Sequence, residues 1–163
     1  MAVIVKEYSA ENAGAAIEIW NEVVRAGDAF PQEEELTETT GDEFFKAQSF
    51  TGLAVDENSG EVLALYILHA NNVGRCGHIS NASYAVRKNL RGRHLGELIV
   101  KHCIAKAREL GFRILQFNAV VARNVHARNL YRRLGFIELG TIPGGFRMPD
   151  GNFVDIVPQY ISL

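Results

Sequence analysis

The sequence predicts an α+β fold with a mostly antiparallel, mixed sheet flanked by helices, and two observations lead to this prediction. The elements follow the order β-α-α-β-β-β-α-β-α-β-β, in which helices are combined with runs of successive strands. In the middle, a strand at 78–86, a helix at 94–110 and a strand at 113–121 form one β-α-β crossover. Such a crossover makes its two strands parallel neighbours. No repeat or linker divides residues 1–163, so we expect a single domain.

Residues 1–70 predict strands at both ends and helices between them. In order, these are a strand at 2–8, a helix at 9–27, a loop at 28–41, a short helix at 42–49 and a hairpin at 50–70. Ser9 is the candidate N-cap of the first helix, because its hydroxyl can accept a bond from a first-turn N–H. Gly27 is its candidate stop. The sequence ENSG at 57–60 is typical of a hairpin turn.

Residues 78–163 predict strands and helices in alternation. In order, these are a strand at 78–86, a helix at 94–110, a buried strand at 112–121, a short helix at 124–135, a strand at 136–142, a turn at 143–151 and a strand at 152–163. One face of the longer helix collects Leu95, Leu98, Ile99, His102, Cys103 and Leu110. Gly111 and Gly135 end the two helices. Pro158 favours an edge position or a bulge for the last strand, because proline lacks a ladder N–H.

The composition is that of an ordinary globular protein, with 47% hydrophobic residues, 22% charged residues and a net charge of −2. Nucleic acids and membrane surfaces select a strong basic excess, so we expect neither as a partner. The first residues lack the basic flank and apolar core of a signal peptide, and no apolar run approaches the roughly 18 residues of a membrane span. Cys76 and Cys103 lie far apart without metal-ligand spacing, which fits reduced thiols. We therefore expect a cytoplasmic protein without a bound metal.

The stretch RKNLRGRHLG, residues 87–96, carries cations and glycines where a helix begins. Four cations surround this helix start: Arg87, Lys88, Arg91 and Arg93. A helix N-terminus offers unpaired backbone N–H groups and a partial positive charge, so it can bind an anion such as a pyrophosphate. Gly92 and Gly96 allow the backbone to approach a ligand closely. The alternative is a solvated connection with ordinary surface arginines.

The same stretch fits the pattern Q/R-x-x-G-x-G/A at the head of a helix. The pattern is occupied by Arg91, Gly92, Arg93, His94, Leu95 and Gly96. Residues 124–136, NVHARNLYRRLGF, fit a second pattern, N-x-x-A-x-x-L-Y-x-x-x-G-F. In both segments, and in the order of its elements, the chain resembles the GNAT superfamily of acetyl-CoA-dependent N-acetyltransferases. His94 departs from the pattern, because the family usually has glycine there. Three alternatives stay open: the remaining amides suffice for phosphate, a protonated His94 adds a cation, or an exposed helix start merely tolerates it.

The resemblance implies that acetyl-CoA is the co-substrate and that an amine attacks its thioester directly. It implies that the cofactor lies where the two parallel strands separate, with its pantetheine arm on free backbone groups of Tyr84, Ala85 and Val86. It also implies that Ala127, in the second pattern, contacts the cofactor, and that Asn124 reaches the cofactor arm or the acceptor. An N-cap role alone would also explain an asparagine at position 124.

Three side chains are candidates for the chemistry. The resemblance implies that Tyr131 protonates the departing thiolate, and a phenol of pKa about 10 is protonated at neutral pH. Its alternative role is core packing. Asn81 and Asn118 are predicted inside the two flanking strands, where asparagine is disfavoured, so their amides could orient an amine or stabilise an oxyanion. The alternative is that each amide satisfies a bulge or a loose sheet edge. The surroundings of both also resemble the branch that acetylates proline analogues such as azetidine-2-carboxylate.

The sequence says less about the residues that bind and deprotonate the acceptor amine. No general base can be assigned, because His78 at a strand start is more typical of a surface residue. A base that acts through water and an amine that arrives neutral are both consistent with the sequence. The acidic run at 33–35 could attract a cationic amine or form a solvated face. The turn at 143–151 could close the acceptor side with Phe146.

We therefore predict an acyltransferase that moves an acetyl group from acetyl-CoA to the amine of a small molecule or amino acid. The sequence is also compatible with a homodimer. Two alternatives are kept. Acetylation of protein N-termini or lysines would require an open acceptor groove, and a non-catalytic module would bind acyl-CoA without turnover.

Overall fold

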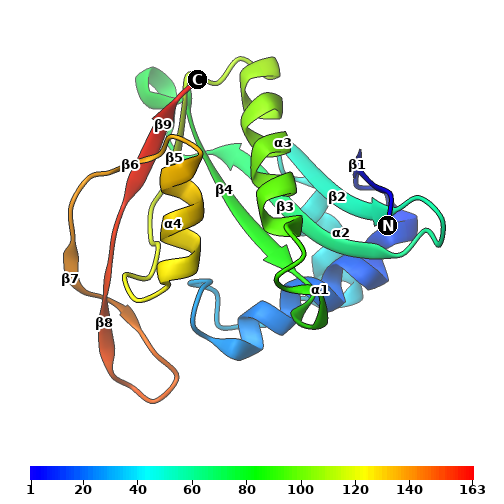
Figure 1. The fold of residues 1–163 in the computed structure, drawn as a ribbon, viewed down its shortest axis with the longest axis horizontal. Helices are drawn as coiled ribbons and strands as arrows, with labels where there is room; N and C mark the ends of the chain where they lie inside the picture. Colours follow the sequence, from blue (N-terminus) through cyan, green and yellow to red (C-terminus); the bar gives the residue numbers. More distant parts are fainter.

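The computed structural model describes all 163 residues as a seven-stranded sheet between helices, with a separate two-stranded hairpin (Figure 1). The strands are β1 (Val3–Glu7), β2 (Phe50–Asp56), β3 (Val62–Ala70), β4 (Ile79–Val86), β5 (Ile114–Phe117), β6 (Ile137–Glu138), β7 (Ile142–Arg147), β8 (Phe153–Ile156) and β9 (Gln159–Ser162). The helices are α1 (Ala13–Ala26), α2 (Glu38–Lys46), α3 (Leu95–Glu109) and α4 (Val125–Arg133). The predicted α+β fold is confirmed.

The strand order of the main sheet is β1-β2-β3-β4-β5-β9-β6, while β7 pairs with β8. Every neighbouring pair is antiparallel except β4 and β5, which are the predicted parallel pair across α3. One face of the sheet buries Trp20 of α1 and Phe45 of α2. The other face buries Ile99 of α3 and contacts Leu130 of α4. No helix is both long and apolar enough to span a membrane.

The parallel strands separate soon after they meet. Their pairing runs only to Asn81 of β4 and Gln116 of β5. β5 ends at Phe117, whereas β4 continues to Val86 with β3 on its other side. From residue 82 to residue 86, one edge of β4 therefore has no strand beside it. Backbone N–H and C=O groups require partners, so this gap in the middle of the sheet presents free donors and acceptors, apart from the Ala82 N–H, which donates to Asn81 Oδ1.

Two local predictions in the first half of the chain are wrong. α2 begins at Glu38, inside the predicted loop, because Thr37 caps it: Thr37 Oγ1 accepts from the Thr40 N–H at 3.1 Å, and Thr40 Oγ1 accepts from the Thr37 N–H at 2.8 Å. This capping box uses threonine where Glu or Gln is usual. Ser9 does not cap α1; it precedes a single 3₁₀ turn and its side chain makes no capping bond. Gly27 does end α1, with a left-handed φ of 67°.

The second half differs from the prediction at strand ends. β5 is short, so Asn118 lies directly after the strand and not inside it. Most of the predicted turn at 143–151 belongs to β7, which forms the separate hairpin with β8. The last strand is not an edge, because β9 lies between β5 and β6, and Pro158 stands just before it. Leu110 was predicted on the buried face of its helix but is 45% exposed.

Candidate functional site

A cleft with a volume of about 1830 Å³ opens where β4 and β5 separate. It extends from the first turns of α3 and α4, along the free edge of β4, to the loop between α1 and α2. Of the residues predicted from the two patterns, the β4 edge and the proposed chemistry, all except Arg93 line this cleft: Asn81, Tyr84, Ala85, Val86, Arg91, Gly92, His94, Leu95, Gly96, Asn118, Asn124, Ala127 and Tyr131. The fold thus brings two distant sequence patterns to one cavity.

The backbone of His94 shapes the start of α3. His94 has a φ of 61°, and it is the only non-glycine residue of the chain with a positive φ. It occupies the N-cap position, yet its side chain makes no capping bond. The first N–H groups of a helix have no partner within the helix, so those at residues 95–97 are available to a ligand. Their residues all line the cleft. The lone acid among them, Glu97, is engaged by Lys101 at 2.9 Å, and this bond lowers the pKa of the carboxyl.

The four predicted cations do not form one cluster. Only Arg91 lines the cleft. Arg87 is 13% exposed and lies 3.3 Å from Glu18 of α1, so it fastens the loop to that helix. Lys88 borders an acidic hollow on the outer surface, and Arg93 also lies outside the cleft. The physical reason is the local backbone: a 3₁₀ turn at Lys88–Leu90 and a left-handed Gly92, with a φ of 82°, separate these residues, so their side chains do not share one side of the segment.

Tyr131 belongs to an aromatic cluster between α4 and the end of β5. Its ring centroid lies 4.7 Å from that of Phe117, 5.6 Å from that of Phe136 and 6.3 Å from that of Tyr84. Burial raises the pKa of the Tyr131 hydroxyl well above its ordinary value. The hydroxyl is therefore protonated at neutral pH, the state that a proton donor requires.

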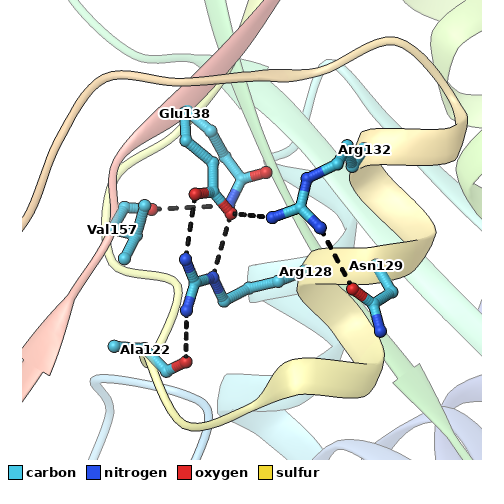
Figure 2. A network of polar contacts seen from close by, with 7 residues as sticks. Ala122, Arg128, Asn129, Arg132, Glu138 and Val157 are labelled. Atoms are coloured by element: carbon cyan, nitrogen blue, oxygen red, sulfur yellow. Dashed lines mark hydrogen bonds and ion pairs between the residues drawn. The ribbon is translucent and has the colours of Figure 1, made fainter.

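An ion-pair network fixes α4 in place (Figure 2). Arg128 donates from Nε and Nη2 to the two carboxylate oxygens of Glu138, each at 2.9 Å, and from Nη1 to the Ala122 carbonyl at 2.8 Å. Arg132 adds a contact of 3.3 Å to the same carboxylate. The Arg128 guanidinium holds the pKa of Glu138 below its usual range. The network joins α4 to β6 and to the preceding loop, so it sets the position of Tyr131.

The start of α4 is capped as the sequence suggests. Asn124 Oδ1 accepts a hydrogen bond from the Ala127 N–H at 3.3 Å. The N-cap role of Asn124 is therefore present in the fold, and both residues line the cleft. Because the cap uses only the amide oxygen, Nδ2 of the same side chain can still donate to a ligand.

Asn81 and Asn118 both line the cleft but are engaged differently. Asn81 Oδ1 accepts from the Ala82 N–H at 2.8 Å, which leaves its Nδ2 donors for a ligand. Asn118 exchanges two bonds with Asn71: its Nδ2 donates at 2.7 Å and its Oδ1 accepts at 3.1 Å. Gln116 also donates to Asn118 Oδ1 at 3.0 Å. These bonds satisfy polar groups at the loose end of the sheet. They therefore agree with the alternative role of Asn118, which is structural.

His69 also lines the cleft, although it was not a predicted site residue. It lies near the end of β3, where its register partner across the antiparallel ladder is Asn81. Its Nδ1 lies 3.0 Å from the carbonyl oxygen of Ala70. A signal was present in the sequence: VLALYILHA is an apolar strand that carries one half-buried histidine at its end.

Two segments meet at the far end of the cleft. Gly27, after α1, lies so close to Pro149 of the hairpin that a Cβ there would be 2.5 Å from Pro149 Cγ. An ion pair between Arg147 and Glu33 joins the same two segments. Met148, beside these contacts, lines the cleft. The β7–β8 hairpin is thus held against the loop after α1 at this end of the cleft.

Two predictions about this end need correction. Phe146 does not line the cleft, because it is buried in a small cluster with Val121 and Ile156. The acidic run at 33–35 does not line it either. Glu33 pairs with Arg147, and its neighbour at position 35 pairs with an arginine of α1. Those carboxylates connect surface segments, so they are not placed to attract a cationic amine.

Comparison with known proteins agrees with the order and shape of these elements. The sequence model described as the acetyltransferase (GNAT) family matches residues 16–136. N-acetyltransferase aca1 of Schizosaccharomyces pombe is 25% identical, with 78% of this chain and 68% of the relative covered. A GCN5-related N-acetyltransferase from Kribbella flavida superposes with a TM-score of 0.91 at 31% identity, over 99% of this chain and 98% of that one. A phosphinothricin acetyltransferase from Sinorhizobium meliloti, solved with acetyl-CoA, shares the fold at a TM-score of 0.90 and 20% identity, over 100% of this chain and 89% of that one.

Proposed function

The chain belongs to the acetyltransferase (GNAT) family, and from this premise we propose that it acetylates the amine of a small molecule. Acetyl-CoA is the co-substrate, as in the family. The finer part of the proposal, a small amine as acceptor, is supported by the contacts that hold the β7–β8 hairpin against the loop after α1 at the far end of the cleft.

The residues along the cleft fit acetyl-CoA. The unpaired edge of β4, from residue 82 to residue 86, can hold the pantetheine arm as an added strand would be held. The uncapped start of α3 suits a pyrophosphate, with Arg91 beside it. A Cβ at Gly92 would meet no atom within 4 Å, so this turn leaves space for a ligand. When bound, acetyl-CoA supplies an activated thioester.

Tyr131 is the proposed acid. A tyrosine hydroxyl is protonated at neutral pH, and burial raises the pKa of Tyr131 further; the residue lies in the cleft beside the separation of the strands. It can give its proton to the departing sulfur. Asn81 has amide donors that can stabilise the charge on the carbonyl oxygen or orient the amine. The network around Arg128 is proposed to hold the acid in place.

The acceptor end favours a compact amine over a protein chain. Apolar side chains from several segments line it, beside the polar Gln32 and Gln48: Val23, Phe30, Phe44, Ile67 and Met148. The hairpin contact at Gly27 borders it. A protein substrate would need an open groove for the residues on either side of its target, whereas a small amine needs only a pocket.

A turnover panel tests the proposal. Thiol release from acetyl-CoA would be followed with small amines, amino acids, proline analogues and peptides. We expect turnover with at least one small amine and little with peptides. Preference for peptides would contradict the acceptor class, and tight acetyl-CoA binding with no turnover would identify a binding module instead.

A further inference from the structure

We propose that His69 is the general base that takes the proton of the acceptor amine. This inference rests on the proposed function and deepens it. Three observations carry the proposal: the place of His69 on the sheet, the bond that orients its ring, and the unsuitable positions of the other proton acceptors in the cleft.

The first observation is position. His69 pairs with Asn81 of β4, and Asn81 pairs on its other side with Gln116 of β5, the last parallel contact before the strands separate. Directly opposed residues of an antiparallel pair project to the same face, so His69 and Asn81 share one side of the sheet. Neighbouring strands are about 4.8 Å apart, so the imidazole can reach an amine held over Asn81 directly or through one water.

The same face of β3 belongs to the acceptor end. Ile67 lies two residues before His69, so both side chains project to one side of the strand. Ile67 is buried in the core cluster that includes Trp20 of α1 and Phe45 of α2. His69 is the next residue on that face, beyond the end of the packed cluster, and it is half-buried in the cleft wall.

The second observation is the state of the ring. Nδ1 of His69 lies 3.0 Å from the carbonyl oxygen of Ala70. A carbonyl oxygen only accepts, so in the neutral ring Nδ1 carries the hydrogen. Nε2 then presents its lone pair, which is the form that a base requires. The Ala70 carbonyl also stabilises the imidazolium that forms after proton uptake, because Nδ1 continues to donate to it.

The third observation concerns the other proton acceptors that line the cleft. Glu97 is already paired with Lys101 at 2.9 Å, in the first turn of α3. His94 precedes the same turn, at the end proposed for the pyrophosphate. Asp28 and His126 are exposed, on the loop after α1 and in the first turn of α4. Of these proton acceptors, His69 is the one that lies on a strand of the sheet, beside the position proposed for the reaction.

The proposed step balances its protons. The amine nitrogen forms a bond to the acetyl carbon, and one of its protons passes to Nε2 of His69. As the carbon–sulfur bond breaks, its electron pair goes to sulfur, which takes a proton from the Tyr131 hydroxyl. His69 then releases its proton to solvent and Tyr131 regains one. An amine that arrives as ammonium first loses one further proton to solvent.

The test compares the wild type with His69→Gln and His69→Ala. We expect kcat/KM to fall about 10²–10⁴-fold in both variants, because a positioned base contributes a factor of this size. Added imidazole should restore part of the activity of His69→Ala, which a purely structural role would not allow. Calorimetry should give unchanged acetyl-CoA affinity, and ¹⁵N NMR of the free wild type should show the Nδ1–H tautomer of His69.

His78→Gln is the matched control, because His78 is an exposed histidine outside the cleft, and it should keep wild-type turnover. Wild-type turnover by His69→Gln would overturn the proposal. So would an Nε2–H tautomer, or a large loss confined to His126→Gln. If the wild type acetylates no amine, the proposed function itself fails, and the role of His69 fails with it.

Discussion

At one end of the cleft the protein offers backbone groups of nearly consecutive residues, and at the other it offers side chains from widely separated segments. The end proposed for the cofactor consists of the free edge of β4 and the start of α3, which a short loop connects. The acceptor end needs β3, the loop after α1 and the β7–β8 hairpin to meet. A short motif can therefore identify the cofactor end, whereas long-range contacts create the acceptor end. Substitutions should affect the two ends separately.

The largest expected effect is on the chemistry between the two ends. Tyr131→Phe removes the proposed acid but keeps the ring that packs against Phe117. We expect kcat to fall about 10²–10³-fold while the Kd for acetyl-CoA stays unchanged. Single-turnover kinetics and calorimetry provide the two measurements. Unchanged turnover would remove the acid role and leave Tyr131 as a packing residue.

The next largest effect tests whether the Arg128–Glu138 ion pair holds α4 in position. Glu138→Ala leaves the Arg128 guanidinium without its carboxylate, and we expect a loss of about 1–2 kcal/mol in the free energy of unfolding, together with a lower kcat. Arg132→Ala is the control, because Arg132 is 60% exposed and makes the weaker contact with the same carboxylate. An equal loss of stability in Arg132→Ala would contradict the proposal that the Arg128–Glu138 pair anchors α4.

The same pair predicts a pH dependence. Arg128 lowers the pKa of Glu138 in the folded chain, so the ion pair stabilises the protein above the ordinary carboxyl pKa. This stabilisation is lost as pH falls through the lowered value. Urea unfolding of the wild type and Glu138→Ala should therefore differ at pH 7, begin to converge as the pH falls below the ordinary carboxyl pKa of about 4, and coincide only below the lowered pKa of Glu138. A difference that persists in acid would point to packing instead of charge.

A smaller effect should be confined to the acceptor end. In Gly27→Ala, the new methyl group would meet Pro149 in a left-handed backbone conformation, so the hairpin tip must shift. We expect about 1–2 kcal/mol lower stability, an altered acceptor KM and an unchanged Kd for acetyl-CoA. Gly60→Ala is a matched control, because it has a similar φ of 76° and no neighbour within 4 Å. If the control alters the acceptor KM equally, backbone strain and not the contact is responsible.

The smallest effect is expected at His94. His94→Gly removes a side chain from a left-handed position but adds freedom to the unfolded chain, so we expect a net change in stability within about 1 kcal/mol. Affinity for acetyl-CoA should stay near that of the wild type, because the backbone already has the conformation that glycine would adopt. A clear loss of affinity would assign the imidazole a direct contact with the cofactor.

The parts that sequence predicted well are those with local causes. The crossover through α3 follows from strand and helix periodicity, and Gly27 ends α1 because a left-handed residue is needed there. The capping box of Thr37 was missed because its partner is a threonine, which carries no strong helix-start signal. The position of β9 depends on which strands it joins, and periodicity does not encode a partner.

The same distinction applies to the candidate site. The motif residues around His94 and Tyr131 were found because their spacing is local. Arg128 and Glu138 were not, since their pairing appears only when α4 folds against β6. Phe146 was placed in the cleft from its glycine-rich surroundings, but packing against the core cluster of Ile156 decides its position.

With acetyl-CoA bound along the unpaired edge of β4, as proposed, the stability of the protein would depend on the supply of acetyl-CoA. A group that pairs with this edge binds the folded chain and not the unfolded one, so it stabilises the fold by mass action. At a concentration about 100 times its Kd, this amounts to about 2.7 kcal/mol. Exposed strand edges also recruit other chains, so the same occupancy would suppress edge-to-edge association. When acetyl-CoA becomes scarce, the protein should then unfold and aggregate more readily, which would make its turnover in the cell responsive to the nutrient it consumes.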